Sequence, residues 1–322
     1  MKLLGLQIPN YTFPGASNDR LFEHVAMLAT TAEDAGFDSV WVMDHFYQLP
    51  NIGPGSDPML EGYTVLSGLA ARTKKIRLGT LVSGVTYRNP ALLAKIVTTL
   101  DIVSAGRAIL GLGAAWKEDE HRAYGYEFPP IGERLNRLEE ALQICRAMFR
   151  EERATFHGRY YHIDDAMNFP RPVQPNGPPI MIGGGGEQRT LRIVAQYGDM
   201  CNIFGDVETV RHKMGVLRYH CESIRRDPDT IVKTRLGGLI IRKTDEEAQR
   251  VFQQLLNRPG INKEWAHNFV VGDPDRVHQQ VQQFLDAGLD GLIFNMPHVE
   301  DPEGIILAGK TLSSLGVAAA AR

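Results

Sequence analysis

Residues 39–44, SVWVMD, form a short apolar run that ends in an acidic residue, and residues 2–8, KLLGLQI, form a similar run. Between them lies a stripe of apolar residues at helical spacing, which stops before Gly36, a residue suited to the left-handed end of a helix. The stripe consists of Leu21, Phe22, Val25, Leu28, Ala29 and Ala32. Continuous apolar runs are typical of parallel strands buried on both faces. The segment therefore predicts a strand, a helix and a second strand in that order.

The same unit recurs along the whole chain. Eight apolar runs, each followed by a helical pattern, lie at residues 2–8, 39–44, 76–82, 107–112, 179–183, 199–204, 236–242 and 288–295. This alternation predicts a protein of the α/β class with a (β/α)8 TIM-barrel fold, and a doubly wound open sheet is the rival architecture. Because no linker interrupts the alternation, we expect one domain over residues 1–322, a length that such barrels reach.

One stretch departs from the alternation. Residues 151–178 lie between a helix predicted over residues 131–149 and the fifth strand, and they carry an aromatic cluster of Phe156, Tyr160 and Tyr161. Long irregular segments in compact domains are usually functional covers or small added hairpins. We therefore expect an inserted loop or hairpin before strand 5.

Composition narrows the class of protein further. The chain is 43% hydrophobic and 23% charged with a net charge of −3, and its Lys and Arg residues are dispersed, so nucleic acid is not an expected partner. The first apolar stretch is too short and polar for a signal peptide, and no stretch approaches the roughly 18 apolar residues of a membrane span. These features indicate a cytoplasmic protein.

The three cysteines show neither a CxxC pair nor a metal-ligand spacing, and no HxH or HExxH motif occurs, so we expect no bound metal.

Catalytic groups of a barrel lie at the carboxyl ends of its strands, and the second predicted strand ends in Asp44 and His45. Histidine titrates near neutral pH and can transfer a proton, which makes His45 the candidate catalytic residue, although a loop-capping role fits the same position. Glu120 and His121 follow the fourth strand at the predicted start of a helix, where a solvated face is an equally good interpretation. Other strand ends offer Asn10, Ser83, Asn202 and Asn295.

A glycine run follows the fifth predicted strand. Gly183, Gly184, Gly185 and Gly186 precede a predicted helix with Arg189 in its first turn. Backbone N–H groups at a helix N-terminus bind anions, and glycine lets a phosphate approach closely. The run indicates a phosphate site, although a tight turn between strand and helix would also use glycine.

Four segments resemble the luciferase-like monooxygenase superfamily in order along most of the chain. They are residues 42–46 (VMDHF), 78–90 (LGTLVSGVTYRNP), 110–116 (LGLGAAW) and 183–187 (GGGGE). Within that superfamily, residues 196–206 (QYGDMCNIFGD) are most similar to a branch of probable F420-dependent oxidoreductases.

The resemblance implies a (β/α)8 barrel, usually a homodimer, with the tricyclic ring of the cofactor in the barrel mouth. Asp44 and His45 would contact the ring region, and the glycine run with Arg189 would hold the cofactor phosphate. A non-proline cis peptide within residues 81–84 would form a bulge behind the ring. The remaining residues of the expected cofactor site are Leu81, Val82, Ser83, Gly113, Ala114 and Asn202.

Ala114 marks a departure from part of this family. Members that oxidise alcohols or sugar phosphates tend to carry a glutamate directly after the Gly-x-Gly of the fourth strand, where this chain has Ala114. The departure disfavours an alcohol dehydrogenase. It favours a reductase that passes a hydride from reduced deazaflavin to an activated double bond or imine of a small molecule, with His45 or water as the proton partner.

Two other functions remain open on the sequence alone. An FMN-dependent monooxygenase served by a partner flavin reductase would use the same barrel and phosphate site. A protein that binds the cofactor without catalysis is the third hypothesis. The preference for F420 rests on the family resemblance, because no single residue requires it.

Overall fold

The structure, a computed structural model, describes residues 3–258, 263–297 and 302–316. Eight parallel strands of the main sheet form a closed barrel. The barrel closes because β12 pairs with both β1 and β10, and β10 also pairs with β9. The ring strands are β1 (Leu3–Ile8), β2 (Ser39–Val42), β3 (Arg77–Thr80), β5 (Ala108–Gly113), β8 (Ile180–Gly183), β9 (Met200–Ile203), β10 (Val232–Ile241) and β12 (Gly291–Asn295). The predicted (β/α)8 barrel is confirmed, and the open sheet is wrong.

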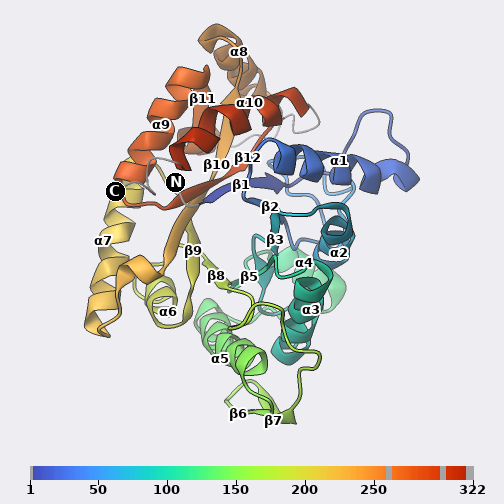
Figure 1. The fold of residues 1–322 in the computed structure, drawn as a ribbon, viewed down its shortest axis with the longest axis vertical. Helices are drawn as coiled ribbons and strands as arrows, with labels where there is room; N and C mark the ends of the chain where they lie inside the picture. Colours follow the sequence, from blue (N-terminus) through green and yellow to red (C-terminus); the bar gives the residue numbers. More distant parts are fainter. Residues whose placement is uncertain (1–2, 259–262, 298–301, 317–322) are drawn as a thin grey trace.

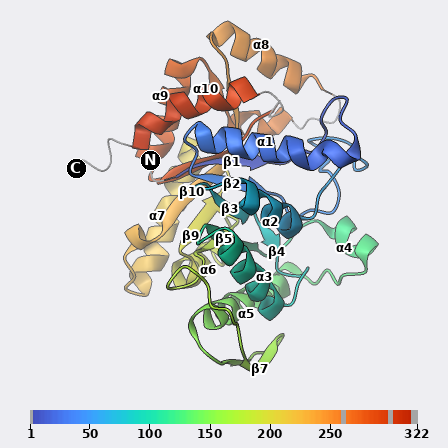
Figure 2. The ribbon, with the colours of Figure 1, turned by 45° about the vertical axis from the view of Figure 1, so that its right-hand side comes forward.

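Helices surround the strands in both ribbon views (Figures 1 and 2). They are α1 (Leu21–Asp34), α2 (Gly62–Arg72), α3 (Pro90–Val103), α4 (Glu118–Tyr124), α5 (Ile131–Arg150), α6 (Thr190–Tyr197), α7 (Val207–Ser223), α8 (Asp245–Leu256), α9 (Pro274–Asp286) and α10 (Pro302–Leu312). The predicted stripe of α1 packs inward, with Leu28 and Ala32 fully buried and Phe22 half-buried. Gly36 has a φ of +89°, the left-handed conformation expected after this helix.

The third strand is interrupted at the point where the cofactor bulge was expected. After β3 the chain forms a short strand, β4 (Ser83–Gly84), which pairs with the end of β5. The peptide bond between Leu81 and Val82, which joins these two strands, is cis. The expected cis peptide within residues 81–84 is therefore present.

Two strand features were not predicted. Strand β10 begins at Val232, four residues before the predicted run. The apolar pattern missed its first part because this part contains Lys233 and Arg235, which are buried despite their charge. A further strand, β11 (Phe269–Gly272), is too short to stand out in the sequence.

Strands β9 and β11 pair with the same edge of β10, one after the other along its length. Residues 232–235 of β10 pair with β9, whereas residues 238–241 pair with β11. The edge is therefore shared by two strands in succession, and β11 widens the sheet at the carboxyl end of the barrel.

The insertion before the fifth barrel strand is a hairpin, as predicted. Strands β6 (Ala154–His157) and β7 (His162–Ala166) pair antiparallel and lie beyond α5 in Figure 1. The carboxylate of Glu140 on α5 accepts hydrogen bonds from the backbone N–H groups of Arg159, Tyr160 and Tyr161 at 2.8–3.0 Å. One helix side chain therefore holds the hairpin turn.

All three cysteines are free and buried. In the described part of the chain, no helix combines the length and apolar character of a membrane span.

Candidate functional site

A cavity of about 850 Å³ lies at the carboxyl ends of the barrel strands. We call it the glycine cavity, because Gly183, Gly184, Gly185 and Gly186 form one of its walls. It brings together every residue of the sequence-predicted site except Asp44. The other predicted residues in its lining are His45, Leu81, Val82, Ser83, Gly113, Ala114, Arg189 and Asn202.

The bulge residue Val82 explains why two of the lining residues are glycines. A Cβ added at Gly113 would lie 2.8 Å from Val82, and a Cβ added at Gly183 would lie 2.7 Å from it. Both distances are too short for carbon atoms, so the Val82 side chain fits only between two residues without side chains. Ser83 behaves differently, since its buried hydroxyl lies 2.8 Å from the Tyr63 hydroxyl, within the protein.

Arg189 lines the cavity, but its guanidinium group contacts side chains of α5. Its Nη2 donates to Asn136 at 2.8 Å and lies 3.1 Å from a carboxylate oxygen of Glu139 on α5. The arginine expected to hold a phosphate is therefore already paired with a carboxylate.

A second cation of this cavity, Lys213 on α7, was missed by sequence reasoning. Its Nζ donates to the carbonyl oxygen of Gly185 at 2.6 Å and lies 3.4 Å from Glu187. A Cβ added at Gly185 would lie 3.3–3.4 Å from the Lys213 side chain, so glycine lets the backbone and the ammonium group approach. Nothing local to residue 213 signals this role, because the lysine reaches the glycine run from a different helix.

These residues fit a phosphate-bearing cofactor. The glycine run precedes the N-terminus of α6, where backbone N–H groups favour an anion. Two positively charged groups lie at the same wall, Lys213 and Arg189, and each is also close to a carboxylate. The absence of side chains at the glycines leaves the backbone accessible to a ligand. The volume of the cavity suits a cofactor-sized molecule.

His45 faces the same cavity and is held from behind by a carboxylate. Its Nδ1 lies 2.8 Å from Oε2 of Glu120, and its ring makes an edge contact with Trp116 at 5.4 Å between centroids. The His45 side chain is 15% exposed, whereas that of Glu120 is completely buried. Because an ionised carboxylate can only accept, Nδ1 carries a hydrogen and Nε2 is the nitrogen left for chemistry.

Glu120 has a full set of donors. Besides His45, its carboxylate accepts from the backbone N–H groups of Phe46 at 2.7 Å and Tyr47 at 3.0 Å, and from the Tyr87 hydroxyl at 2.9 Å. Burial alone would raise the pKa of Glu120, but the hydrogen bond and charge of His45, with the two backbone donors, outweigh it and lower this pKa below its usual range. Glu120 is therefore held as an ionised group against His45.

The solvated-face interpretation of Glu120 and His121 is wrong. Both side chains are buried, because one face of α4 packs on the loops after β2 and β4. The His121 ring nitrogens lie 2.6 Å from the Thr86 hydroxyl and 2.7 Å from the Lys117 carbonyl. The sequence gives no sign of this packing, since α4 has acidic residues throughout its first turn.

Asp44 does not line the glycine cavity. Its buried carboxylate receives two hydrogen bonds from Arg88, at 2.7 and 3.0 Å, and Arg88 also contacts Glu61. Burial opposes the positive charge, but the Asp44 carboxylate outweighs it and raises the pKa of Arg88. Asp44 therefore anchors the loop that carries His45 rather than facing a ligand.

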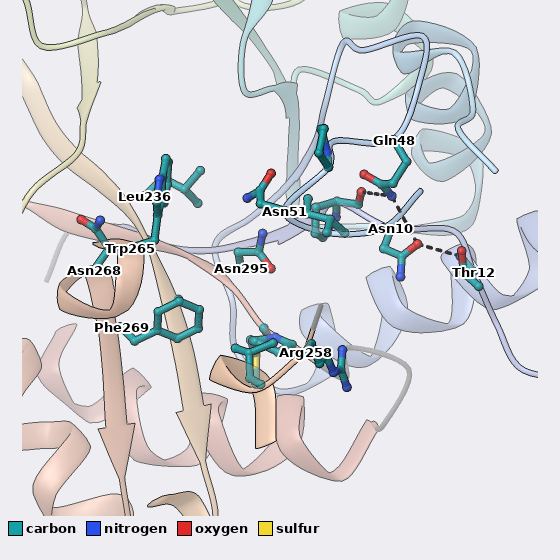
Figure 3. A pocket seen from close by; sticks show the side chains of 18 of the residues that line it. Asn10, Thr12, Gln48, Asn51, Leu236, Arg258, Trp265, Asn268, Phe269 and Asn295 are labelled. Carbon is teal, nitrogen blue, oxygen red and sulfur yellow. Dashed lines mark hydrogen bonds between the residues drawn. The ribbon is translucent and has the colours of Figure 1, made fainter. Parts of the chain in front are cut away.

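A second cavity, of about 940 Å³, adjoins the first, and the two share Phe204 and Leu236 in their linings. We call it the amide cavity because carboxamide side chains recur in its wall. They are Asn10, Gln48, Asn51, Asn268 and Asn295 (Figure 3). Its aromatic residues include Trp265 and Phe269.

The fold and the paired cavities define a (β/α)8 barrel whose site lies at the carboxyl ends of its strands. The model of the luciferase-like monooxygenase family matches residues 8–306, so the chain belongs to that family of oxidoreductase enzymes. The family prediction made from the motifs is confirmed.

Three relatives illustrate the range of the family. A curated F420-dependent glucose-6-phosphate dehydrogenase of Kineococcus radiotolerans is 31% identical over 302 residues, which cover 85% of this chain and 87% of the relative. The coenzyme F420 dependent tetrahydromethanopterin reductase of Methanopyrus kandleri has a TM-score of 0.78 at 18% identity, covering 96% of this chain and 97% of that one. The oxygenating constituent of 3,6-diketocamphane monooxygenase of Pseudomonas putida, in complex with FMN, has a TM-score of 0.77 at 18% identity and covers 97% of each chain. Both expected cofactors, F420 and FMN as the alternative, agree with these relatives.

Proposed function

We propose that the protein is an F420-dependent oxidoreductase that reduces an activated double bond or imine of a small organic substrate. The observation that carries this proposal is the pair of His45 and Glu120 beside the glycine cavity, at 2.8 Å between Nδ1 and Oε2. A reduction adds a hydride and a proton to the substrate, and this pair is suited to supply the proton.

The residues of the chain have distinct roles in this scheme. Bound F420 supplies two-electron hydride chemistry. The glycine run, Lys213 and Arg189 would hold its phosphate group, and the Val82 bulge would lie behind its ring. Glu120 accepts the hydrogen bond of His45 Nδ1 and orients the ring, which leaves Nε2 to pass a proton to the substrate.

Ala114 supports reduction over alcohol oxidation. It lies in the lining of the glycine cavity, at the position where family members that oxidise alcohols or sugar phosphates tend to carry glutamate. A methyl group cannot accept the proton that an alcohol loses on oxidation. The direction of hydride transfer that best suits this wall is therefore toward the substrate.

The cofactor is tested by titrating the purified protein with F420 and with FMN and following the chromophore of each. We expect F420 to bind at micromolar concentration or below and FMN to bind at least tenfold more weakly. The reverse order, together with oxygen consumption in the presence of reduced FMN, would replace the proposal with a monooxygenase that needs a partner flavin reductase. Tight F420 binding without turnover of enones or imines would indicate instead a protein that binds the cofactor without catalysis.

The proton carrier is tested with His45→Ala. Loss of the positioned acid should lower kcat by about 10²–10⁴-fold while the Kd for F420 changes little. Unchanged turnover of the variant, with intact cofactor binding, would remove His45 from this role.

A further inference from the structure

The floor of the amide cavity is a row of three residues on neighbouring strands. Gly238 of β10 pairs with Phe269 of β11 on one side and with Asn295 of β12 on the other. Phe269 and Asn295 both line the cavity, so their side chains lie on the same face of the sheet.

Glycine at position 238 allows the aromatic ring to lie over the sheet. A Cβ added at Gly238 would be 2.2 Å from two ring atoms of Phe269, a distance that no real side chain tolerates. The ring therefore occupies the space where a side chain at position 238 would stand. The floor offers a flat apolar surface beside the Asn295 carboxamide.

The polar groups of the cavity are mainly carboxamides. The side chains of Asn51 and Asn295 point into the same space in Figure 3. Asn268 belongs to the same wall, but its Oδ1 is buried away from the cavity and its Nδ2 lies 3.1 Å from Nε2 of His267. A carboxamide N–H that faces the cavity can donate to a carbonyl oxygen of a ligand.

The floor of the cavity carries no charged side chain, since its row consists of Gly238, Phe269 and Asn295. The charged residues of the described lining belong to other segments, and they are Lys117, Asp119 and Arg258. Lys117 and Asp119 form an ion pair at 2.6 Å. A phosphate or carboxylate seated on the floor would lose hydration without an ion-pair partner in that row.

We infer that the amide cavity selects an uncharged, planar, conjugated carbonyl compound, which stacks on Phe269 and receives a hydrogen bond from Asn295 on its carbonyl oxygen. This inference rests on the proposed function and specifies its substrate class. The cavity volume of about 940 Å³ accommodates a bicyclic compound. The shared residues Phe204 and Leu236 place the substrate next to the glycine cavity.

The reaction balances for such a substrate. Bound F420 would supply a hydride, with its two electrons, to the carbon β to the carbonyl, where a C–H bond would form as the C=C π bond breaks. The displaced electron pair moves toward the carbonyl oxygen, where the Asn295 N–H stabilises the developing negative charge. A proton from His45, directly or through water, then forms the second C–H bond at the α carbon.

The test is calorimetric titration of the cofactor-free protein with coumarin and with coumarin-3-carboxylate, which differ by one negative charge on the same plane. We expect coumarin to bind at least tenfold more tightly than its carboxylate and more tightly than glucose 6-phosphate. Asn295→Leu and Gly238→Ala should each weaken coumarin binding at least tenfold and leave F420 binding within twofold. Gly215→Ala on α7, where an added Cβ meets no atom within 4 Å, is the matched control and should change neither ligand.

The outcomes separate this inference from the function on which it rests. Equal or tighter binding of the carboxylate or of glucose 6-phosphate, or unchanged coumarin binding by both floor variants, overturns the neutral-carbonyl inference while F420 binding still supports the proposed function. Absence of F420 binding in the same titrations instead overturns the proposed function.

Discussion

His45 and Glu120 illustrate what a sequence reveals about single residues. His45 was predicted because it follows a strand, and strands of this kind end at the site. Glu120 could not be predicted, because its burial depends on how α4 packs against Phe46 and Tyr87, which are far away in the sequence. The same holds for Lys213, which reaches the glycine run from α7.

Glu120→Gln should affect catalysis through His45. Glutamine replaces one acceptor oxygen with an NH2 donor, so the hydrogen bonds that orient the His45 ring cannot all be kept, and we expect kcat to fall about 10-fold or more. A residue that acts only through His45 should have little further effect on kcat in a His45→Ala background. An equal loss of rate in both backgrounds would contradict the positioning role.

The same variant should reveal a pH-dependent contribution to stability. The folded-state pKa of Glu120 is lowered, so its contribution is present above the ordinary glutamate pKa of about 4.3 and is lost as the pH falls through the lowered value. We expect Glu120→Gln to reduce the free energy of unfolding by about 1–3 kcal/mol at neutral pH. In urea titrations this difference should shrink below about pH 4, and a constant difference would count against the ionised pair.

Val82 and Gly183 should be energetically coupled. Gly183→Ala places a methyl group against Val82 and should cost about 1–3 kcal/mol of unfolding free energy. In a Val82→Ala background the obstruction is gone, so the cost should be smaller by more than about 0.5 kcal/mol. Additive effects in the urea-unfolding cycle would show that the two side chains do not compete for the same space.

At the scale of elements, the sequence predicted the presence of the strands better than their boundaries. Seven of the apolar runs agree closely with barrel strands, since continuous burial leaves a clear pattern. The beginning of β10 was missed because Lys233 is buried beside Asp290, at 3.2 Å, and only the tertiary structure supplies that partner. The brief strand β11 depends on the free edge of β10 for its existence.

The hairpin β6–β7 should depend on Glu140. Glu140→Ala removes the acceptor of three backbone N–H groups at the turn, so the hairpin should open more often. We expect trypsin to cleave after Arg159 about tenfold faster, with little change in the unfolding of the barrel. Mass spectrometry of the fragments identifies the site. Glu152→Ala, at a nearby exposed glutamate, is the matched control, and equal acceleration in both variants would exclude the turn contact as the cause.

At the scale of the whole molecule, ligand binding should be visible in the melting temperature. At a free F420 concentration about 100 times its Kd, binding should add about 2.7 kcal/mol of stability, which corresponds to a rise in Tm of about 4 °C for a chain of this size. Differential scanning fluorimetry with F420 and FMN at equal concentrations measures the shift. A larger shift with FMN would contradict the deazaflavin assignment.

The homodimer implied by the family resemblance stays a prediction. Three apolar residues of α3 face different surroundings, since Leu100 is buried, Ile96 is half-buried and Leu92 is 55% exposed. Their sequence spacing alone could not distinguish packing on the barrel from packing on a partner. The cytoplasmic location and the single domain over residues 1–322 likewise stay predictions.

The succession of β9 and β11 along β10 separates the proposed substrate wall from the strands that close the barrel. Ring closure uses residues 232–238 of β10, whereas β11 joins at residues 238–241. We therefore expect that residues 243–272 can be exchanged for those of a relative while the ring and the proposed proton carrier His45 stay as they are. Evolution can change substrate preference in this way without rebuilding the catalytic machinery, and chimeric barrels made at these two boundaries offer the same route to a protein engineer.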